Sequence, residues 1–116
     1  MSQHEIAPAV LKRLKELGGN KLIIGLIQMY LERTPAKIQA ISHAIERTDY
    51  AVIENTAHSL IASTGNLGGM GVSNLSVKLE QAAMEKNMEV ISRVASELLV
   101  AEETFTAYLK EELEKI

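Results

Sequence analysis

The sequence has no cysteine and no tryptophan, and its aromatic residues are one phenylalanine and three tyrosines. Without cysteine there can be no disulfide, thiolate metal site or cysteine nucleophile, and a reducing compartment is permitted, so we expect a cytoplasmic protein. With so few aromatic residues, the core must be built mainly from aliphatic side chains, which favours helices.

Long apolar runs and clustered positive charge are also missing. The longest apolar stretch covers residues 22–27, far below the roughly 20 residues that span a bilayer, and the first residues lack a signal-peptide pattern. The net charge is −3, whereas a nucleic-acid binder needs clustered lysine and arginine. We therefore expect no membrane and no nucleic-acid partner, and a monomer whose residues 1–116 form one domain.

Apolar residues recur at helical spacing from Pro8 onward. Gly18 and Gly19 end a short first helix, because paired glycines disfavour helix continuation. A long second helix follows to about residue 45, and its apolar positions stay in phase across Pro35. That phase favours one long helix kinked at Pro35 over two separate helices.

The second half of the chain reads as three further helices. Thr48 or Asp49 can cap the third helix, and the glycine-rich residues 65–71 form a tight connection to the fourth, giving an antiparallel hairpin. The fourth helix ends near Asn87, which tolerates the left-handed conformation of a helix end, and the fifth begins at about Glu89.

On the fifth helix, charged residues occupy the side opposite the apolar face, and we expect them to contact water: Glu102, Glu103, Lys110 and Glu111. No strand signal, linker or internal repeat interrupts the helical pattern. The sequence therefore predicts an all-α fold, an antiparallel up-and-down four-helix bundle with a short additional N-terminal helix.

His58 lies outside the apolar stripe of the third helix, roughly 100° around the helix from Ala57. We expect its side chain to face solvent in the middle of the helix. Most such histidines are only solvated surface residues. Ala62 and Gly65 lie one and two turns further along nearly the same face, and small residues there would let a partner approach, although they could equally serve tight packing against the next helix.

Glu80 is the predicted neighbour of His58 across the hairpin. If the turn is centred near Gly69, positions whose numbers sum to 138 lie opposite one another. The Glu80 carboxylate could then accept the Nδ1 proton of His58 and leave Nε2 as the nucleophilic nitrogen. The alternative is an ordinary exposed glutamate.

Ile61 flanks His58, and Met70 and Val72 lie near the end of the hairpin. All three could belong to an exposed apolar rim for partner docking, whereas Ile61 could also be partly buried at the edge of the core. The three histidines lack the spacing of a helix-borne metal site, and no Gly-Lys-Ser/Thr follows the glycines, so we expect neither metal nor bound nucleotide.

The segment AHSLIASTGNLGGMGVSNLSVKLEQA, residues 57–82, resembles the signature of histidine-containing phosphotransfer (HPt) domains. The resemblance extends upstream to LKELGG and to the long helix with a central proline, so it covers nearly the whole chain. The matching positions are His58, Leu60, Ala62, Ser63, Asn66, Leu67, Gly68, Leu79 and Glu80.

The resemblance implies that His58 accepts a phosphoryl group from a receiver-domain aspartate and passes it to another receiver, with Ala62, Ser63, Gly65 and Glu80 in support. The implied partners are response-regulator receivers and a hybrid sensor histidine kinase, and the cofactor is the receiver's own Mg²⁺. One position departs from the pattern, because Ile61 stands where the family usually has lysine. That departure keeps open a degenerate adaptor that binds signalling domains without carrying phosphate.

Overall fold

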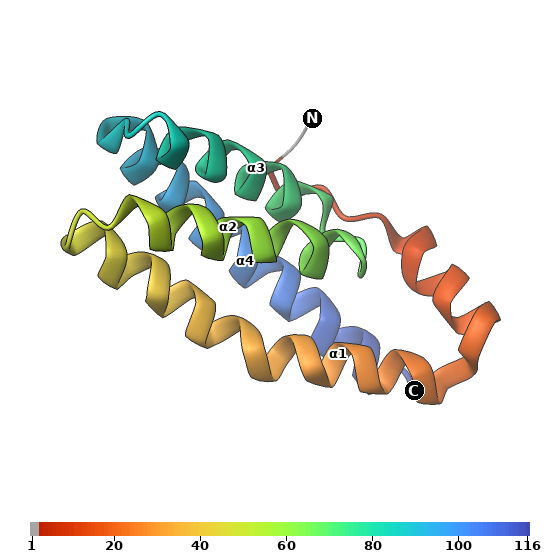
Figure 1. The fold of residues 1–116 in the computed structure, drawn as a ribbon. Helices are drawn as coiled ribbons and strands as arrows, with labels where there is room; N and C mark the ends of the chain where they lie inside the picture. Colours follow the sequence, from red (N-terminus) through yellow and green to blue (C-terminus); the bar gives the residue numbers. More distant parts are fainter. Residues whose placement is uncertain (1–2) are drawn as a thin grey trace.

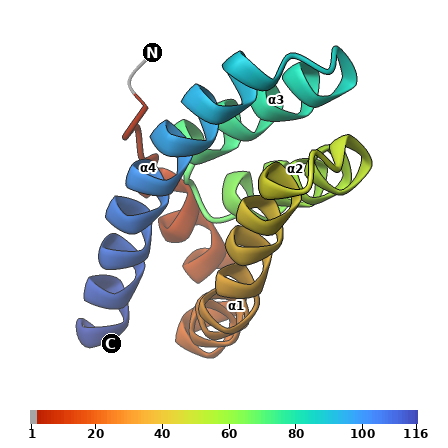
Figure 2. The same cartoon turned by 90° about the vertical axis from the view of Figure 1, so that its left-hand side faces the viewer.

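A computed structural model describes residues 3–116 as an antiparallel helical bundle (Figure 1). The helices are α1 (Pro8–Glu46), α2 (Tyr50–Gly65), α3 (Met70–Met84) and α4 (Met88–Glu114). Each helix packs against the next in chain order, and α4 returns to α1, which closes the bundle (Figure 2). The predicted all-α, up-and-down architecture is confirmed, and no strand occurs within residues 3–116.

The short N-terminal helix is present as the first part of α1. Gly19 breaks the helical backbone with φ 72° and ψ −171°, a conformation that only glycine adopts without strain. The chain turns sharply at this point, and the rest of α1 runs along the bundle (Figure 1). Beyond Gly19 the helix continues through Pro35, which is exposed, so the phase argument for one helix over two was correct.

The core is mainly aliphatic, as the composition predicted, and includes two aromatic side chains, Phe105 and Tyr30. Phe105 is 1% exposed and lies edge-on to Tyr30, with ring centroids 5.4 Å apart. Around it the largest fully buried aliphatic side chains are Ile27, Ile53, Leu60, Leu75, Leu79, Ile91, Leu98 and Leu109. Burying such side chains contributes roughly 1.5–3 kcal/mol each, which holds the four helices together.

Helix caps define two of the connections. Asp49 caps α2, because its side chain accepts a hydrogen bond from the backbone N–H of Val52 at 3.2 Å. The expected role of Asn87 was wrong: Lys86 takes the left-handed conformation, with φ 56°. Asn87 instead caps α4 by accepting from the N–H of Val90. The cap satisfies an N–H that the first helical turn would otherwise leave unpaired.

The glycine-rich connection between α2 and α3 is tight for a reason that the sequence did not reveal. The N-terminal segment crosses it, with the N–H of Ala7 bonded to the carbonyl of Gly68 at 2.8 Å. On the other side, a Cβ at Gly69 would lie 2.7 Å from the Phe105 ring. Side chains are excluded here because backbone and core approach from both sides, and this fixes the hairpin that carries the candidate site.

Candidate functional site

His58 projects from the middle of α2 toward solvent, as predicted. Its side chain is 74% exposed, while the preceding residue, Ala57, is fully buried. The two residues differ by about 100° around the helix, which is enough to move from the core to the surface. The imidazole is thus presented on a rigid scaffold and can be reached by another protein.

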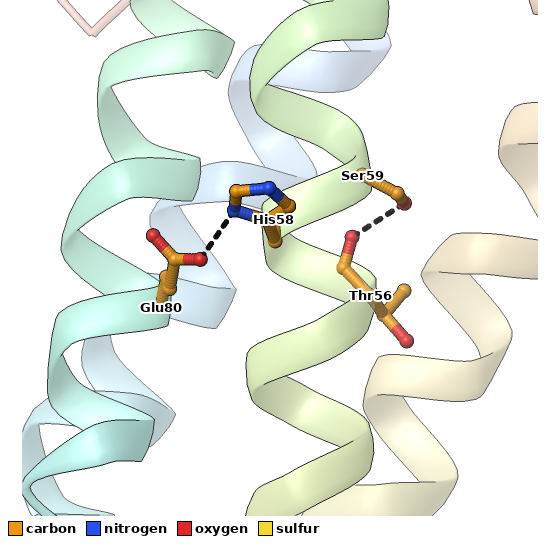
Figure 3. Close-up of polar contacts among 4 residues, drawn as sticks. All are labelled: Thr56, His58, Ser59 and Glu80. Carbon is orange, nitrogen blue, oxygen red and sulfur yellow. Dashed lines mark hydrogen bonds and ion pairs between the residues drawn. The ribbon is translucent and has the colours of Figure 1, made fainter.

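Glu80 of α3 orients the His58 ring. Its Oε2 lies 2.6 Å from Nδ1 of His58, and Figure 3 shows the second ring nitrogen pointing away from Glu80. A carboxylate can only accept at Nδ1, so the bond places the proton on Nδ1 and leaves the Nε2 lone pair available in the neutral ring. The expected pairing is present in the geometry; its role in phosphoryl transfer stays a prediction.

The same register recurs along the hairpin. A Cβ at Gly65 would lie 3.4 Å from Oγ of Ser73, and this hydroxyl donates to the backbone carbonyl of Ile61 at 2.9 Å. Residues whose numbers sum to 138 therefore face one another at two levels of the hairpin. His58 faces Glu80, and Gly65 faces Ser73. Gly65 serves close packing against α3 and does not open the surface, whereas Ala62 is exposed beside His58.

The other predicted residues are more scattered. Ile61 is half-buried beside the Ser73 contact. Ser63 faces the opposite side of α2, where it lines a groove against α1. Met70 is half-buried at the start of α3, ten residues and thus roughly 15 Å along the helix from Glu80. The structure therefore gathers Glu80, Ile61 and Ala62 around His58, and leaves Ser63 and Met70 away from it.

Two exposed apolar residues near His58 were not predicted from the sequence. Val77 and Met84 lie one turn before and one turn after Glu80 on α3, and they are 46% and 58% exposed. Residues spaced three and four apart share a helix face, so this spacing from Glu80 was a usable signal. Val72, at the other end of α3, is only 2% exposed and cannot contribute to a surface.

Glu102 of α4 is half-buried, so its predicted contact with water is only partial. It accepts hydrogen bonds from the hydroxyl of Tyr30, at 3.2 Å, and from Thr106. Burial raises the pKa of Glu102 above its ordinary value, and the hydrogen bonds from Thr106 and Tyr30 only partly offset this. Burial likewise raises the pKa of Tyr30. This cluster ties α1 to α4 inside the bundle.

No group of three or more histidine, cysteine or acidic residues within residues 3–116 could hold a metal ion. In the same part of the chain, no helix is long and apolar enough to cross a membrane. The site consists of the exposed imidazole of His58, which Glu80 orients across the hairpin. A helical bundle that presents a surface histidine oriented by a carboxylate defines the class of protein.

Comparisons with known proteins specify the class. The family model of the Hpt domain matches residues 25–116, and the chain belongs to this family. Its fold matches the crystal structure of histidine-containing phosphotransfer protein B (HptB) from Pseudomonas aeruginosa PAO1 with a TM-score of 0.90, at 16% identity, over 99% of each chain. No curated protein matches the chain in sequence. Membership in the family supports a phosphotransfer role in two-component signalling, in which Hpt proteins work with receiver and kinase domains.

Proposed function

We propose that this protein is a phosphorelay intermediate that carries a phosphoryl group on Nε2 of His58. The donor is the phosphorylated aspartate of a receiver domain, in a response regulator or a hybrid sensor histidine kinase, and the acceptor is another receiver. The observation that carries the proposal is the 2.6 Å bond between His58 Nδ1 and Glu80 on a side chain that is 74% exposed. It combines an available nucleophile with a fixed ring orientation.

The chemical step needs little from the bundle. The Nε2 lone pair attacks phosphorus, the N–P bond forms, and the bond from phosphorus to the aspartate oxygen breaks with the carboxylate leaving. The ring becomes a phosphoimidazolium that still carries its Nδ1 proton, and the Glu80 carboxylate stabilises this positive charge. The receiver supplies the Mg²⁺ that neutralises phosphoryl charge, so the carrier requires no nucleotide or metal of its own.

Transfer of label from a phosphorylated receiver tests this function. The wild-type chain should acquire acid-labile, alkali-stable phosphate, and His58→Gln should acquire none. Glutamine keeps hydrogen-bonding capacity but has no nucleophilic ring nitrogen, and the matched control His43→Gln changes another exposed histidine, on α1. Label that survives His58→Gln would contradict the proposal.

A second candidate is an adaptor that binds receivers without accepting phosphate. The observation that favours it is the absence of any lysine or arginine from α2, because Ile61 stands where the family usually has a phosphate-facing lysine. Receiver binding that is unchanged by His58→Gln, together with no label from any receiver, would support the adaptor.

A further inference from the structure

Two adjacent apolar side chains of α4 are exposed beside a groove. Leu99 and Val100 are 43% and 53% exposed. The groove, of about 320 Å³, lies between α1 and α4, and Leu99 forms part of its wall. Across the groove, α1 contributes Ile38, Ile41 and Ile45. Exposed apolar side chains next to an apolar groove are typical of a protein–protein contact.

This surface lies on the far side of the bundle from the helix that carries His58. Among the described helices, α4 contacts α3 and α1 but not α2, and Figure 2 shows α4 and α2 on opposite sides of the molecule. A protein bound at His58 would therefore leave the outward face of α4 uncovered. The face needs a different occupant.

The outward face of α4 also carries a charge of opposite sign at each end. Glu89 lies in the first turn and Lys110 near the last turn, and both are exposed. Leu99 and Val100 stand midway between them in the sequence. At 100° per residue, the four side chains point within about 50° of one common direction. The face thus reads acidic, apolar and basic along the helix.

A second copy of α4 running antiparallel would complement this face. Residues whose numbers sum to 199 would then lie level, so that Glu89 meets Lys110 of the second copy and Leu99 meets its Val100. A two-fold contact uses the same surface on both copies, so each pair occurs twice. Within residues 3–116 neither Glu89 nor Lys110 forms an ion pair, and Lys110 interacts with Glu102 only beyond ion-pair distance. No exposed α4 residues of like charge lie level in this register.

We propose that α4 is the interface of an antiparallel homodimer, in place of the monomer that we expected from the sequence. Leu99 and Val100 of the two copies pack together at the mouths of the two grooves, and the Glu89–Lys110 pairs fix the antiparallel direction. α4 has 27 residues and is thus roughly 40 Å long. A strip about 15 Å wide along it buries roughly 600 Å² per copy, which is at the lower end of specific interfaces. The dimer should therefore dissociate at micromolar concentrations and leave both His58 side chains exposed.

Exchanging the end charges tests the dimer by sedimentation at low salt. Wild type should be dimeric at about 500 μM and monomeric at about 1 μM. Glu89→Lys and Lys110→Glu each place like charges opposite one another, so each variant alone should dimerise about tenfold more weakly or worse. An equimolar mixture of the two should form a heterodimer with the wild-type dissociation constant, because every end pair is then of opposite sign. Lys78→Glu makes the same charge change on exposed α3 surface and should behave as wild type. A wild-type chain that stays monomeric, or a mixture that does not associate, overturns the proposal.

Cysteine cross-linking locates the interface even if a charge variant proves unfolded by circular dichroism. The chain has no cysteine, and Val100→Cys would lie beside the two-fold axis. It should form a disulfide-linked dimer on mild oxidation, whereas Val77→Cys, at a similarly exposed residue of α3, should not.

In the linked Val100→Cys dimer, diethyl pyrocarbonate should modify His58 at the rate of the reduced chain. Equal cross-linking of the two cysteine variants, or protection of His58 in the linked dimer, would contradict the proposed interface. None of these measurements uses phosphoryl transfer, so their failure leaves the proposed function untouched.

Discussion

Nδ1 of His58 and Oε2 of Glu80 lie 2.6 Å apart, across the hairpin formed by α2 and α3. The residues are 22 positions apart in sequence, and the tight glycine connection brings them to the same level of the bundle. The bond is at the surface, where such a pair contributes little to folding. Its value lies in holding one tautomer and one ring orientation.

Replacing Glu80 should therefore affect transfer more than stability. For Glu80→Ala we expect a loss of about tenfold in the rate of phosphoryl transfer, by analogy with other groups that orient a histidine. Glu80→Gln should lose less, because its amide oxygen still accepts from Nδ1–H. Rapid-quench transfer assays and urea unfolding measure the two effects, and a large stability loss with unchanged transfer would contradict the assigned role.

Ala62 leaves the surface beside His58 open, so a bulky residue there should obstruct the partner. We expect Ala62→Leu to reduce transfer from a receiver at least tenfold while leaving phosphoramidate labelling of His58 unchanged, because only a protein donor must approach closely. Ala107→Leu is the matched control on exposed α4 surface. Equal transfer by the two variants would show that the receiver does not cover Ala62.

Ile61→Lys restores the residue that the family usually has. An exposed cation near phosphate is worth about 0.2–1 kcal/mol, so transfer or the lifetime of phosphohistidine should improve by up to about fivefold. The variant should unfold at lower urea concentration, because Ile61 is half-buried and lysine loses that apolar contact. Phosphohistidine decay measured at neutral pH decides the point, and a shorter lifetime would refute the expected charge effect.

Glu102 should make folding depend on pH. Burial raises its pKa above the ordinary value of 4.5, so the folded state holds the proton more tightly than the unfolded state does. The free energy of unfolding then decreases as the pH rises above 4.5 through the raised pKa. Glu102→Gln keeps an acceptor for Tyr30 and should remove this decrease. Glu103→Gln, at its exposed neighbour, should retain most of it, because burial raises the pKa of Glu102 more than the charge of Glu103 does. Urea unfolding between about pH 4 and 8 tests the sign, and an identical slope in both variants would disprove it.

The glycine connection can be tested by a pair of alanine substitutions. Gly69→Ala would place a Cβ 2.7 Å from the Phe105 ring, and overpacking of this kind costs about 1–3 kcal/mol. Gly25→Ala meets nothing within 4 Å and should stabilise α1 by roughly 0.5–1 kcal/mol. The thermal unfolding temperature should decrease for Gly69→Ala and increase for Gly25→Ala. An unchanged unfolding temperature for Gly69→Ala would show that the connection can relax.

Local rules predicted much of this molecule. The helical spacing of the apolar residues correctly predicted that α1 continues through Pro35. The register of the hairpin about Gly69 correctly predicted that Glu80 lies opposite His58. Both predictions follow from regular geometry over short distances. Asn87 was predicted to end α3 in a left-handed conformation, but it caps the start of α4. The sequence could not decide between the two roles, because asparagine favours both.

Contacts between distant segments could not be predicted in the same way. Tyr30 and Glu102 are 72 residues apart, and nothing in the pattern of α4 shows that one acidic side chain turns inward. The groove between α1 and α4 depends on how far those two helices stand apart, which side-chain packing determines. The passage of the N-terminal segment over Gly68 was hidden for the same reason.

The central claim is that Glu80 leaves Nε2 of His58 as the phosphorylated atom. Phosphorus–nitrogen NMR of the ¹⁵N-histidine-labelled protein, phosphorylated by a receiver, identifies the bonded nitrogen directly. We predict one phosphohistidine, at His58, with phosphorus coupled to Nε2 and with Nδ1 still protonated. Phosphorus on Nδ1, or on any residue other than His58, would contradict this account.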